Sequence, residues 1–147
     1  MKVRRLTVED DPQAATMLLQ RFFREEGFTT ADATIASNLR AMLSLEHCAV
    51  LVADVQGIAA GVATVSMDFG IEFGWSAELG DLYVLPEHRG RGVARALIAE
   101  AENWLRGMGA TGYQVTVTPH GADADLRRFY LALGFAAEGR ELLYRTL

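Results

Sequence analysis

One stretch of the chain, in which a strand passes into a helix, decides the fold: Leu82-Tyr83-Val84-Leu85-Pro86-Glu87-His88-Arg89-Gly90-Arg91-Gly92-Val93-Ala94. The apolar run at its start is typical of a strand that stops at Pro86. A helix follows, because apolar residues recur at helical spacing over Gly92–Met108. The first N–H groups of a helix favour anions, and Gly90 and Gly92 let an anion approach the backbone. The stretch predicts a pyrophosphate-binding turn, although a solvated turn with exposed arginines would show the same glycine pattern.

Further elements are expected on both sides of this stretch. Strands are expected at Lys2–Thr7, Cys48–Val55, Ile58–Met67, Glu78–Leu85, Tyr113–Thr118 and Leu142–Leu147. Helices are expected at Pro12–Glu25, Asp32–Leu43, Gly92–Met108 and Asp123–Leu133. Gln56-Gly57 supplies the glycine that a tight hairpin turn needs. The order β-α-α-β-β-β-α-β-α-β predicts an α/β protein with a mixed sheet, helices on both faces and one parallel crossover.

The composition is that of one globular domain over residues 1–147, with 50% hydrophobic and 22% charged residues. The apolar runs are too short to span a bilayer and the N-terminus is too polar for a signal peptide, which predicts a cytoplasmic protein. The net charge of -5 works against nucleic-acid binding. No metal site is expected, because Cys48 has no second cysteine and the three histidines have no metal-ligand spacing.

Two motifs resemble those of the GNAT superfamily of N-acetyltransferases. Arg89-Gly90-Arg91-Gly92-Val93-Ala94 matches the signature (Gln/Arg)-x-x-Gly-x-(Gly/Ala), and the run from Phe129 to Phe135 resembles the hallmark Phe-Tyr-x-x-x-Gly-Phe. The order of elements is also similar from end to end. The resemblance implies the acyl-CoA N-acyltransferase fold and acetyl-CoA as the acetyl donor, without a metal.

The resemblance also implies how the coenzyme would be held. Backbone amides of the signature loop would bind the pyrophosphate, and the exposed edge of the strand before it would pair with the pantetheine arm. The residues concerned are Tyr83, Val84, Leu85, Arg89, Gly90, Arg91, Gly92, Val93 and Ala94. Asp123 stands where the family often has an asparagine that contacts the coenzyme arm. Because an aspartate accepts but cannot donate a hydrogen bond, it is also interpreted as a helix cap.

Three residues are candidates for catalysis. Tyr130 aligns with the tyrosine that often protonates the leaving thiolate in this family. Glu78, eleven residues before Arg89, matches the general base of histone-acetylating relatives. Asp81, eight residues before Arg89, matches an aspartate of small aminoglycoside 3-N-acetyltransferases and is favoured slightly. Their offset of three puts these two acids on opposite faces of a regular strand, so a bulge would be required for both to face one pocket.

The acceptor site is expected where acids and aromatic rings gather, near the first two helices and the Phe69–Trp75 connection. The candidate substrate-binding residues are Glu72, Trp75, Phe28 and Asp32. With Glu78 and Asp81 they would form an acidic mouth, extended by Glu25 and Glu26 and lined further by Phe73, that attracts a polycation. Together with the resemblance to small aminoglycoside N-acetyltransferases, this favours an aminoglycoside as the small-molecule amine acceptor.

Other functions fit the same features. A polyamine or another amine metabolite would suit an acidic mouth, and a protein N-terminus or lysine would need an open groove. A coenzyme A-binding module without catalysis would need neither Tyr130 nor the two strand acids. The apolar segment Leu142–Leu147 also makes a homodimer possible, through strand exchange or edge pairing.

Overall fold

The computed structural model describes residues 1–123 and 125–147 and contains two compact units, Met1–Val115 and Thr116–Leu147. The side chains of Ala122 and Asp123 also lie outside this description. In the first unit the elements follow in the order β1 (Lys2–Arg5), α1 (Gln13–Glu26), α2 (Asp32–Leu43), β2 (Cys48–Val55), β3 (Ile58–Gly70), β4 (Gly74–Val84), the 3-10 turn η1 (Pro86–His88), α3 (Val93–Gly107) and β5 (Tyr113–Gln114).

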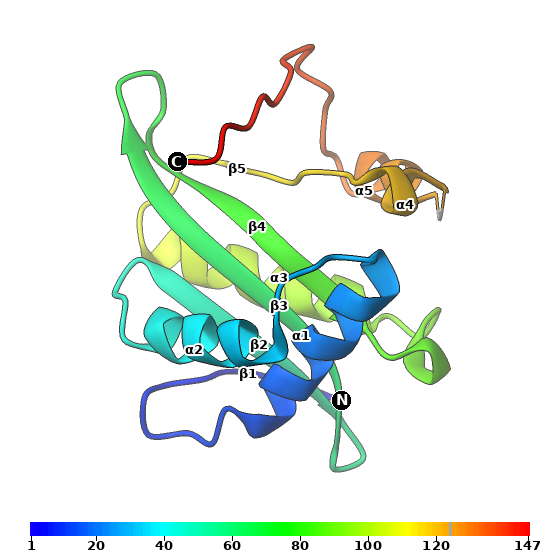
Figure 1. Cartoon of the computed structure of the whole chain (residues 1–147). Helices are drawn as coiled ribbons and strands as arrows, with labels where there is room; N and C mark the ends of the chain where they lie inside the picture. The colour runs from blue at the N-terminus through cyan, green and yellow to red at the C-terminus, as the bar shows by residue number, and fades with distance from the viewer. Residues whose placement is uncertain (124) are drawn as a thin grey trace. The chain divides into compact units, whose positions relative to one another are not determined.

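The strands of the first unit form a mixed sheet in the order β1-β2-β3-β4-β5, which confirms the predicted α/β class (Figure 1). Neighbouring strands from β1 to β4 run antiparallel, and β5 runs parallel to β4. Since parallel neighbours need a crossover, α3 connects these last two strands. The first hairpin turns at Gln56 and Gly57, with φ values of 53° and 83°, as the sequence predicted.

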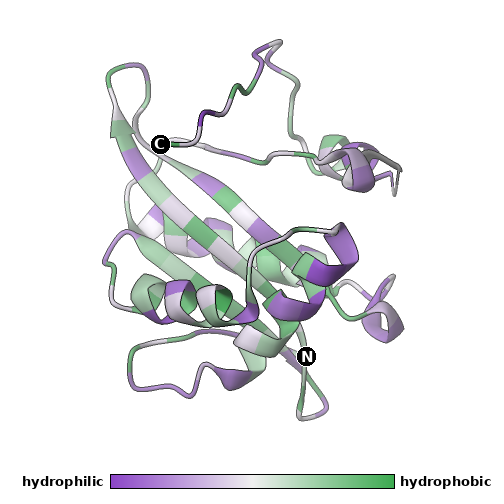
Figure 2. Cartoon of the chain, viewed as in Figure 1, coloured by the Kyte–Doolittle hydropathy of each residue, from purple (hydrophilic) through white to green (hydrophobic). Residues whose placement is uncertain are grey.

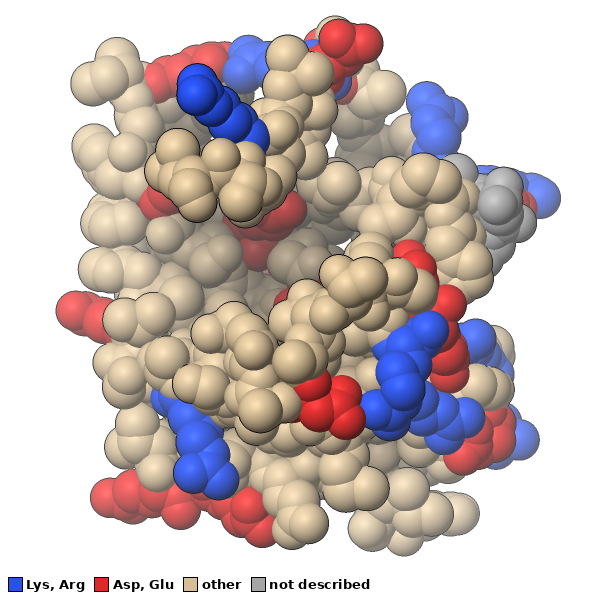
Figure 3. All heavy atoms as spheres, in the orientation of Figure 1, with Lys and Arg blue, Asp and Glu red and all other residues tan. Residues whose placement is uncertain are grey.

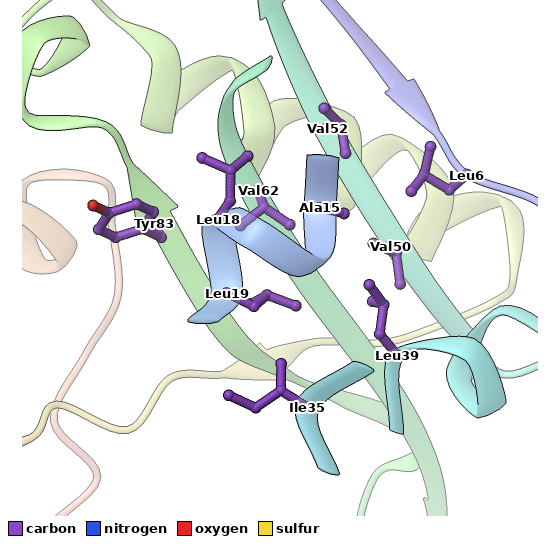
Figure 4. Close-up of a cluster of buried hydrophobic side chains, with 10 residues drawn as sticks. All are labelled: Leu6, Ala15, Leu18, Leu19, Ile35, Leu39, Val50, Val52, Val62 and Tyr83. Atoms are coloured by element: carbon purple, nitrogen blue, oxygen red, sulfur yellow. The ribbon is translucent and has the colours of Figure 1, made fainter. Parts of the chain in front are cut away.

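Helices cover both faces of this sheet: α1 and α2 lie on one face and α3 on the other (Figure 1). The first face carries a buried apolar cluster to which both helices and three strands contribute (Figure 4). Its members are Leu6, Ala15, Leu18, Leu19, Ile35, Leu39, Val50, Val52, Val62 and Tyr83. Figure 2 shows that the middle strands are mainly apolar or weakly polar, as expected for strands covered on both sides.

On the opposite face, a glycine lets α3 pack directly against β3. A Cβ atom added at Gly61 would lie 3.1 Å from side-chain atoms of Val93 and Leu97, and 3.0 Å from the backbone oxygen of Tyr83. These distances leave no room for a larger residue without a shift of the helix or the strand. The beginning of α3 is therefore held close to the sheet at the end of β4.

The second hairpin is longer than predicted. Its strands were expected to end at Met67 and to begin at Glu78, with a loop between them, but β3 and β4 stay paired as far as Gly70 and Gly74. Backbone pairing continues through this aromatic segment because Phe69 and Trp75 face each other across the strands, with ring centroids 5.2 Å apart. The Phe69–Trp75 connection is thus a hairpin tip.

The second unit contains α4 (Pro119–Asp123) and α5 (Leu126–Ala132). The helix predicted over Asp123–Leu133 begins later than expected, at Leu126, because Asp125 has a positive φ of 62° that a continuous helix does not allow.

Two predicted strand bounds also fail. The strand expected over Tyr113–Thr118 is limited to Tyr113–Gln114, and residues 142–147 form no strand. Leu142 and Leu143 are 73% and 89% exposed, so this apolar segment is not buried as a strand of the sheet would be. Within the described residues, no helix combines the length and the apolarity needed to cross a bilayer.

Candidate active site

A β-bulge in β4 brings Glu78 and Asp81 to the same face of the sheet. In β3, Thr64 pairs with Asp81. Ser66, two positions further along the same face, pairs with Glu78. Gly80 is left as an extra residue without a partner in β3, which is the definition of a bulge. The condition for both acids to serve one pocket is therefore met, on the face covered by α1 and α2.

The surroundings of Asp81 favour a carboxyl that holds a proton more readily than usual. Burial raises the pKa of Asp81, the hydrogen bond from Thr64 lowers it in part, and the nearby charge of Glu78 raises it. The net direction is upward from the ordinary value. A carboxylate with a raised pKa is a stronger base at neutral pH, so Asp81 has the property that a general base needs.

The signature loop has the backbone geometry of an anion site. Gly90 and Gly92 adopt φ values of 73° and 83°, in the left-handed region that favours glycine. Gly92 is the N-cap of α3 and no side chain caps the helix there. The N–H of Ala96 donates to the carbonyl of Gly92, so the amides of the turn before it are those that a helix leaves without an internal acceptor. Arg91 beside them is exposed.

Arg89 is held by the protein itself. Its Nε donates to the backbone oxygen of Val84 at 2.9 Å, and its Nη2 lies 3.0 Å from Oε2 of Glu25 at the end of α1. Its backbone N–H donates to the carbonyl of Pro86. Arg89 therefore ties the loop to β4 and α1, and of the two loop arginines only Arg91 is exposed without an ion pair to the described residues.

Glu25 joins the loop to the buried face of β4. The hydroxyl of Tyr83 donates to its Oε1 at 2.6 Å, and the Arg89 guanidinium lies over the Tyr83 ring at 5.5 Å from the centroid. Burial raises the pKa of Glu25, but the hydrogen bonds from Tyr83 and Arg89 outweigh it, so the net direction is downward and the residue stays a carboxylate. Burial and the bond to Glu25 raise the pKa of Tyr83 to about 12, so its hydroxyl keeps its proton.

The edge of β4 that faces β5 is open over half its length. The two strands pair only at Ala77 and Glu78. From Leu79 to Val84 no described strand pairs with this edge, so β4 and β5 diverge after Glu78. The predicted coenzyme contacts at the strand end are not equivalent, because the N–H of Leu85 already donates to Ala60 in β3. Backbone groups of successive strand residues point to opposite edges. Of the three predicted contacts Tyr83, Val84 and Leu85, it is therefore Val84 whose backbone faces the open edge, where its carbonyl accepts from Arg89.

Two predicted site residues belong to the second unit and are described within it alone. Tyr130 is buried and its ring contacts Phe129 and Phe135, both at 5.3 Å between centroids. Burial raises the pKa of Tyr130 to about 12. A phenol with this pKa keeps its proton at neutral pH and can donate it. Asp123 is the last residue of α4, and its side chain lies outside the described part of the structure.

The predicted acceptor residues do not form one group. Phe28 packs on Phe22, with centroids 6.3 Å apart, and Phe22 lies against Tyr83 on the Asp81 face. Trp75 lies on the other face of the sheet, because it is two positions from buried Ala77 and therefore shares the face of Ala77 and not that of Glu78. Its ring stacks on that of His47, with centroids 4.4 Å apart. Glu72 lies in the turn at the hairpin tip. The residues are separated because different elements carry them: Phe28 follows α1 and Asp32 begins α2, whereas Glu72 and Trp75 belong to the β3–β4 hairpin.

Two acids of the expected acidic mouth form ion pairs with arginines. Asp32 is exposed and lies 3.2 Å from Arg24, while Glu25 contacts both Arg21 and Arg89. Figure 3 shows acidic and basic side chains interleaved on the face that carries α1 and α2. Glu78 and Asp81, the two acids of the expected mouth that lie on β4, share a face at the bulge.

One residue of the site, Thr64, was missed from the sequence, because it stands in an apolar strand and resembles an ordinary β-branched residue. Glu25 was expected in the acidic mouth, but its contacts with Tyr83 and Arg89 were not predicted. Their partners Asp81 and Tyr83 are 17 and 58 positions away in the chain. No local pattern connects residues so far apart.

The sheet thus carries a bulged acid pair, a fourth strand that pairs only partly with the fifth, and a glycine-containing turn before α3. Comparison with known proteins identifies the class of protein: residues 13–135 match the acetyltransferase (GNAT) family. The aminoglycoside N(6')-acetyltransferase type 1 of Salmonella typhimurium is 30% identical over 108 residues, which are 71% of this chain and 73% of that protein. The chain therefore belongs to the GNAT family and is an N-acetyltransferase.

Solved structures share the fold over almost the whole chain. Aminoglycoside N-acetyltransferase AAC(6')-Iy, in complex with CoA, superposes with a TM-score of 0.85 at 23% identity, covering 99% of this chain and 93% of that one. The aminoglycoside acetyltransferase meta-AAC0020 from an uncultured soil metagenomic sample, in complex with sisomicin, gives a TM-score of 0.80 at 21% identity, covering 99% and 95%. At these identities the likeness establishes the fold.

Proposed function

We propose that this chain transfers an acetyl group from acetyl-CoA to a primary amine of a small polycationic acceptor, with an aminoglycoside as the favoured class. The observation that carries the proposal is the bulge at Gly80, which turns Glu78 and Asp81 to one face beside the open edge of β4. The names of the relatives, which specify aminoglycoside acetylation, support the choice of acceptor.

The coenzyme is held in this proposal by the turn before α3 and by the open edge of β4. The amides from Arg91 to Ala94 bind the pyrophosphate, with the exposed Arg91 guanidinium adding charge. The Val84 backbone pairs with the pantetheine arm. The Arg89 side chain holds the loop in place through its ion pair with Glu25 and does not contact the phosphates. Acetyl-CoA supplies the thioester whose acyl group is transferred.

The acid pair prepares the amine. An ammonium cannot attack a thioester, so one proton must first leave the nitrogen. Asp81 accepts this proton, and Glu78 attracts the cation and raises the proton affinity of its neighbour. The neutral amine attacks the thioester carbon, the C–S bond breaks, and Tyr130 donates a proton to the departing thiolate. The nitrogen loses its surplus proton to solvent as the amide forms. Solvent returns a proton to the Tyr130 oxygen and takes the proton from Asp81, which restores both residues.

The test is the release of coenzyme A from acetyl-CoA, measured against aminoglycosides, polyamines, amino acids, and N-terminal or lysine peptides. Preferential turnover of aminoglycosides is expected, and NMR of the product then identifies the acetylated nitrogen. Turnover of peptides or polyamines alone would reject the proposed acceptor. Coenzyme binding without turnover of any amine would instead identify a non-catalytic coenzyme-binding module.

A further inference from the structure

A buried hydroxyl in β3 contacts the proposed base. Thr64 is 3% exposed and stands between Ala63 and Val65, which are 0% and 1% exposed. Its Oγ1 donates a hydrogen bond of 2.5 Å to Oδ2 of Asp81 on the neighbouring strand. This distance lies at the short end of the range for a hydroxyl that donates to a carboxylate.

The hydroxyl is unusual for its position. The neighbouring residues on β3 are small and apolar, and a valine would have the same shape and would be favoured in a strand. A buried hydroxyl costs free energy unless it is hydrogen-bonded, and here the partner is the Asp81 carboxylate. The bulge at Gly80 is what places that carboxylate opposite Thr64 in the register.

We propose that Thr64 is a positioning residue for Asp81, which fixes Oδ2 and leaves Oδ1 as the oxygen that takes the proton from the amine. This inference rests on the proposed role of Asp81 as the base. Among the described residues Oδ1 has no hydrogen-bond partner. In the step itself the N–H bond of the ammonium breaks as the O–H bond to Oδ1 forms, which leaves a neutral amine and a neutral carboxylic acid.

The other titratable groups on this face act differently on Asp81. On β4, Glu78 raises the pKa of Asp81, whereas the Thr64 hydrogen bond lowers it. Asp68 lies further along the same face of β3, opposite Ser76. From α1, Glu25 is engaged by Tyr83. Loss of the Thr64 hydroxyl therefore shifts the titration of Asp81 in one direction, to higher pH.

The first test needs no turnover. The chemical shift of the Asp81 carboxyl carbon is followed against pH in ¹³C-labelled protein and is assigned by its absence from the Asp81→Asn spectrum. Thr64→Val is expected to titrate at higher pH than the wild type, and Thr64→Ser, which keeps the hydroxyl, is expected to titrate near it. Identical midpoints for all three proteins would overturn the inference.

The second test asks whether the contact matters for the reaction. On the acid side of the pH profile, Thr64→Val is expected to lower kcat/KM for the amine roughly tenfold or more, as loss of a hydrogen bond to a charged group implies. The KM for acetyl-CoA stays unchanged, and Thr64→Ser recovers most of the activity. Ser44→Ala, which removes a hydroxyl bonded within α2, serves as the matched control with wild-type kinetics.

The outcomes separate this inference from the proposed function. A pH profile of Thr64→Val that coincides with that of the wild type, while Asp81→Asn is inactive, would reject Thr64 and leave the base assignment standing. An Asp81→Asn enzyme that keeps the wild-type profile would reject the base and this inference with it. Thermal melts of each variant identify any loss of folding, and Thr64→Ser provides the result if Thr64→Val does not fold.

Discussion

Glu78 and Asp81 stand on the same face of the sheet although three positions separate them, because the backbone bulges at Gly80. Two carboxylates so placed resist being ionised together, which is one reason why the pKa of Asp81 is raised, after its burial. In the proposed function, the pair combines a site for a cation with a group that takes up a proton. This relationship is the basis of the following predictions.

Replacement of Asp81 by asparagine should remove the base and keep the local structure, because the amide oxygen can still accept from Thr64. We expect kcat to fall by about 10²–10⁴, the range for loss of general base catalysis. The KM for acetyl-CoA should stay near the wild-type value. Steady-state release of coenzyme A measures both quantities, and a kcat within a few-fold of wild type would rule out Asp81 as the base.

Replacement of Glu78 by glutamine should move the pH profile. Activity requires the ionised form of Asp81, so kcat/KM rises with pH through the pKa of this residue. The Glu78 charge raises that pKa, and its removal lowers it, so the acid limb of the profile should move to lower pH. The direction is opposite to that expected for Thr64→Val. An acid limb that stays in place would show that Glu78 does not act on the titrating group.

Replacement of Arg91 by alanine should weaken coenzyme binding without loss of stability, because the side chain is exposed. We expect the KM for acetyl-CoA to rise about three- to tenfold, as for loss of one charge-assisted contact of about 1 kcal/mol. The control is Arg5→Ala, which removes the same charge from the exposed end of β1. Equal coenzyme affinity in the two variants would show that Arg91 is a solvated surface residue that does not contribute to coenzyme binding.

Replacement of Glu25 by alanine should loosen the signature loop. Arg89 loses its ion-pair partner and the Tyr83 hydroxyl loses its acceptor, which should cost about 1 kcal/mol of stability, or about 3 °C in Tm. A higher KM for acetyl-CoA should accompany the lower Tm, because Arg89 positions the loop. Glu46→Ala, at an exposed acid before β2, provides the control. A lower Tm with an unchanged KM would limit Glu25 to a role in stability.

Replacement of Tyr130 by phenylalanine should remove the proton donor and retain the ring contacts with Phe129 and Phe135. We expect kcat to fall by about 10²–10⁴, the range for loss of general acid catalysis, with a wild-type melting curve. A donor thioester with a more acidic thiol should reduce the difference, because its thiolate needs less protonation. No change with either donor would make Tyr130 a packing residue.

Much of the architecture was predictable because the patterns that specify it are local. The order of the elements in the first unit, the turn at Gln56 and the glycines before α3 follow from periodicity and turn chemistry. The extent of the β3–β4 hairpin could not be predicted in this way. The aromatic and glycine residues of Phe69–Trp75 resemble a loop in sequence, but pairing between the two strands keeps them extended. The apolar residues of the C-terminal segment predicted a strand. A strand forms only when it pairs with the edge of another strand, and the sequence of the segment does not specify such a pairing.

The sequence by itself determined the fold class, the glycine-containing turn before α3 and the presence of two acids in β4, because helix starts, glycines and side-chain alternation act over a few neighbouring residues. Only the tertiary structure decided that both acids share a face, since a bulge depends on the register between two strands. It also decided that Thr64 holds Asp81 and that Glu25 holds Arg89. These contacts join positions 17 and 64 residues apart, which become neighbours only when the sheet and α1 have packed.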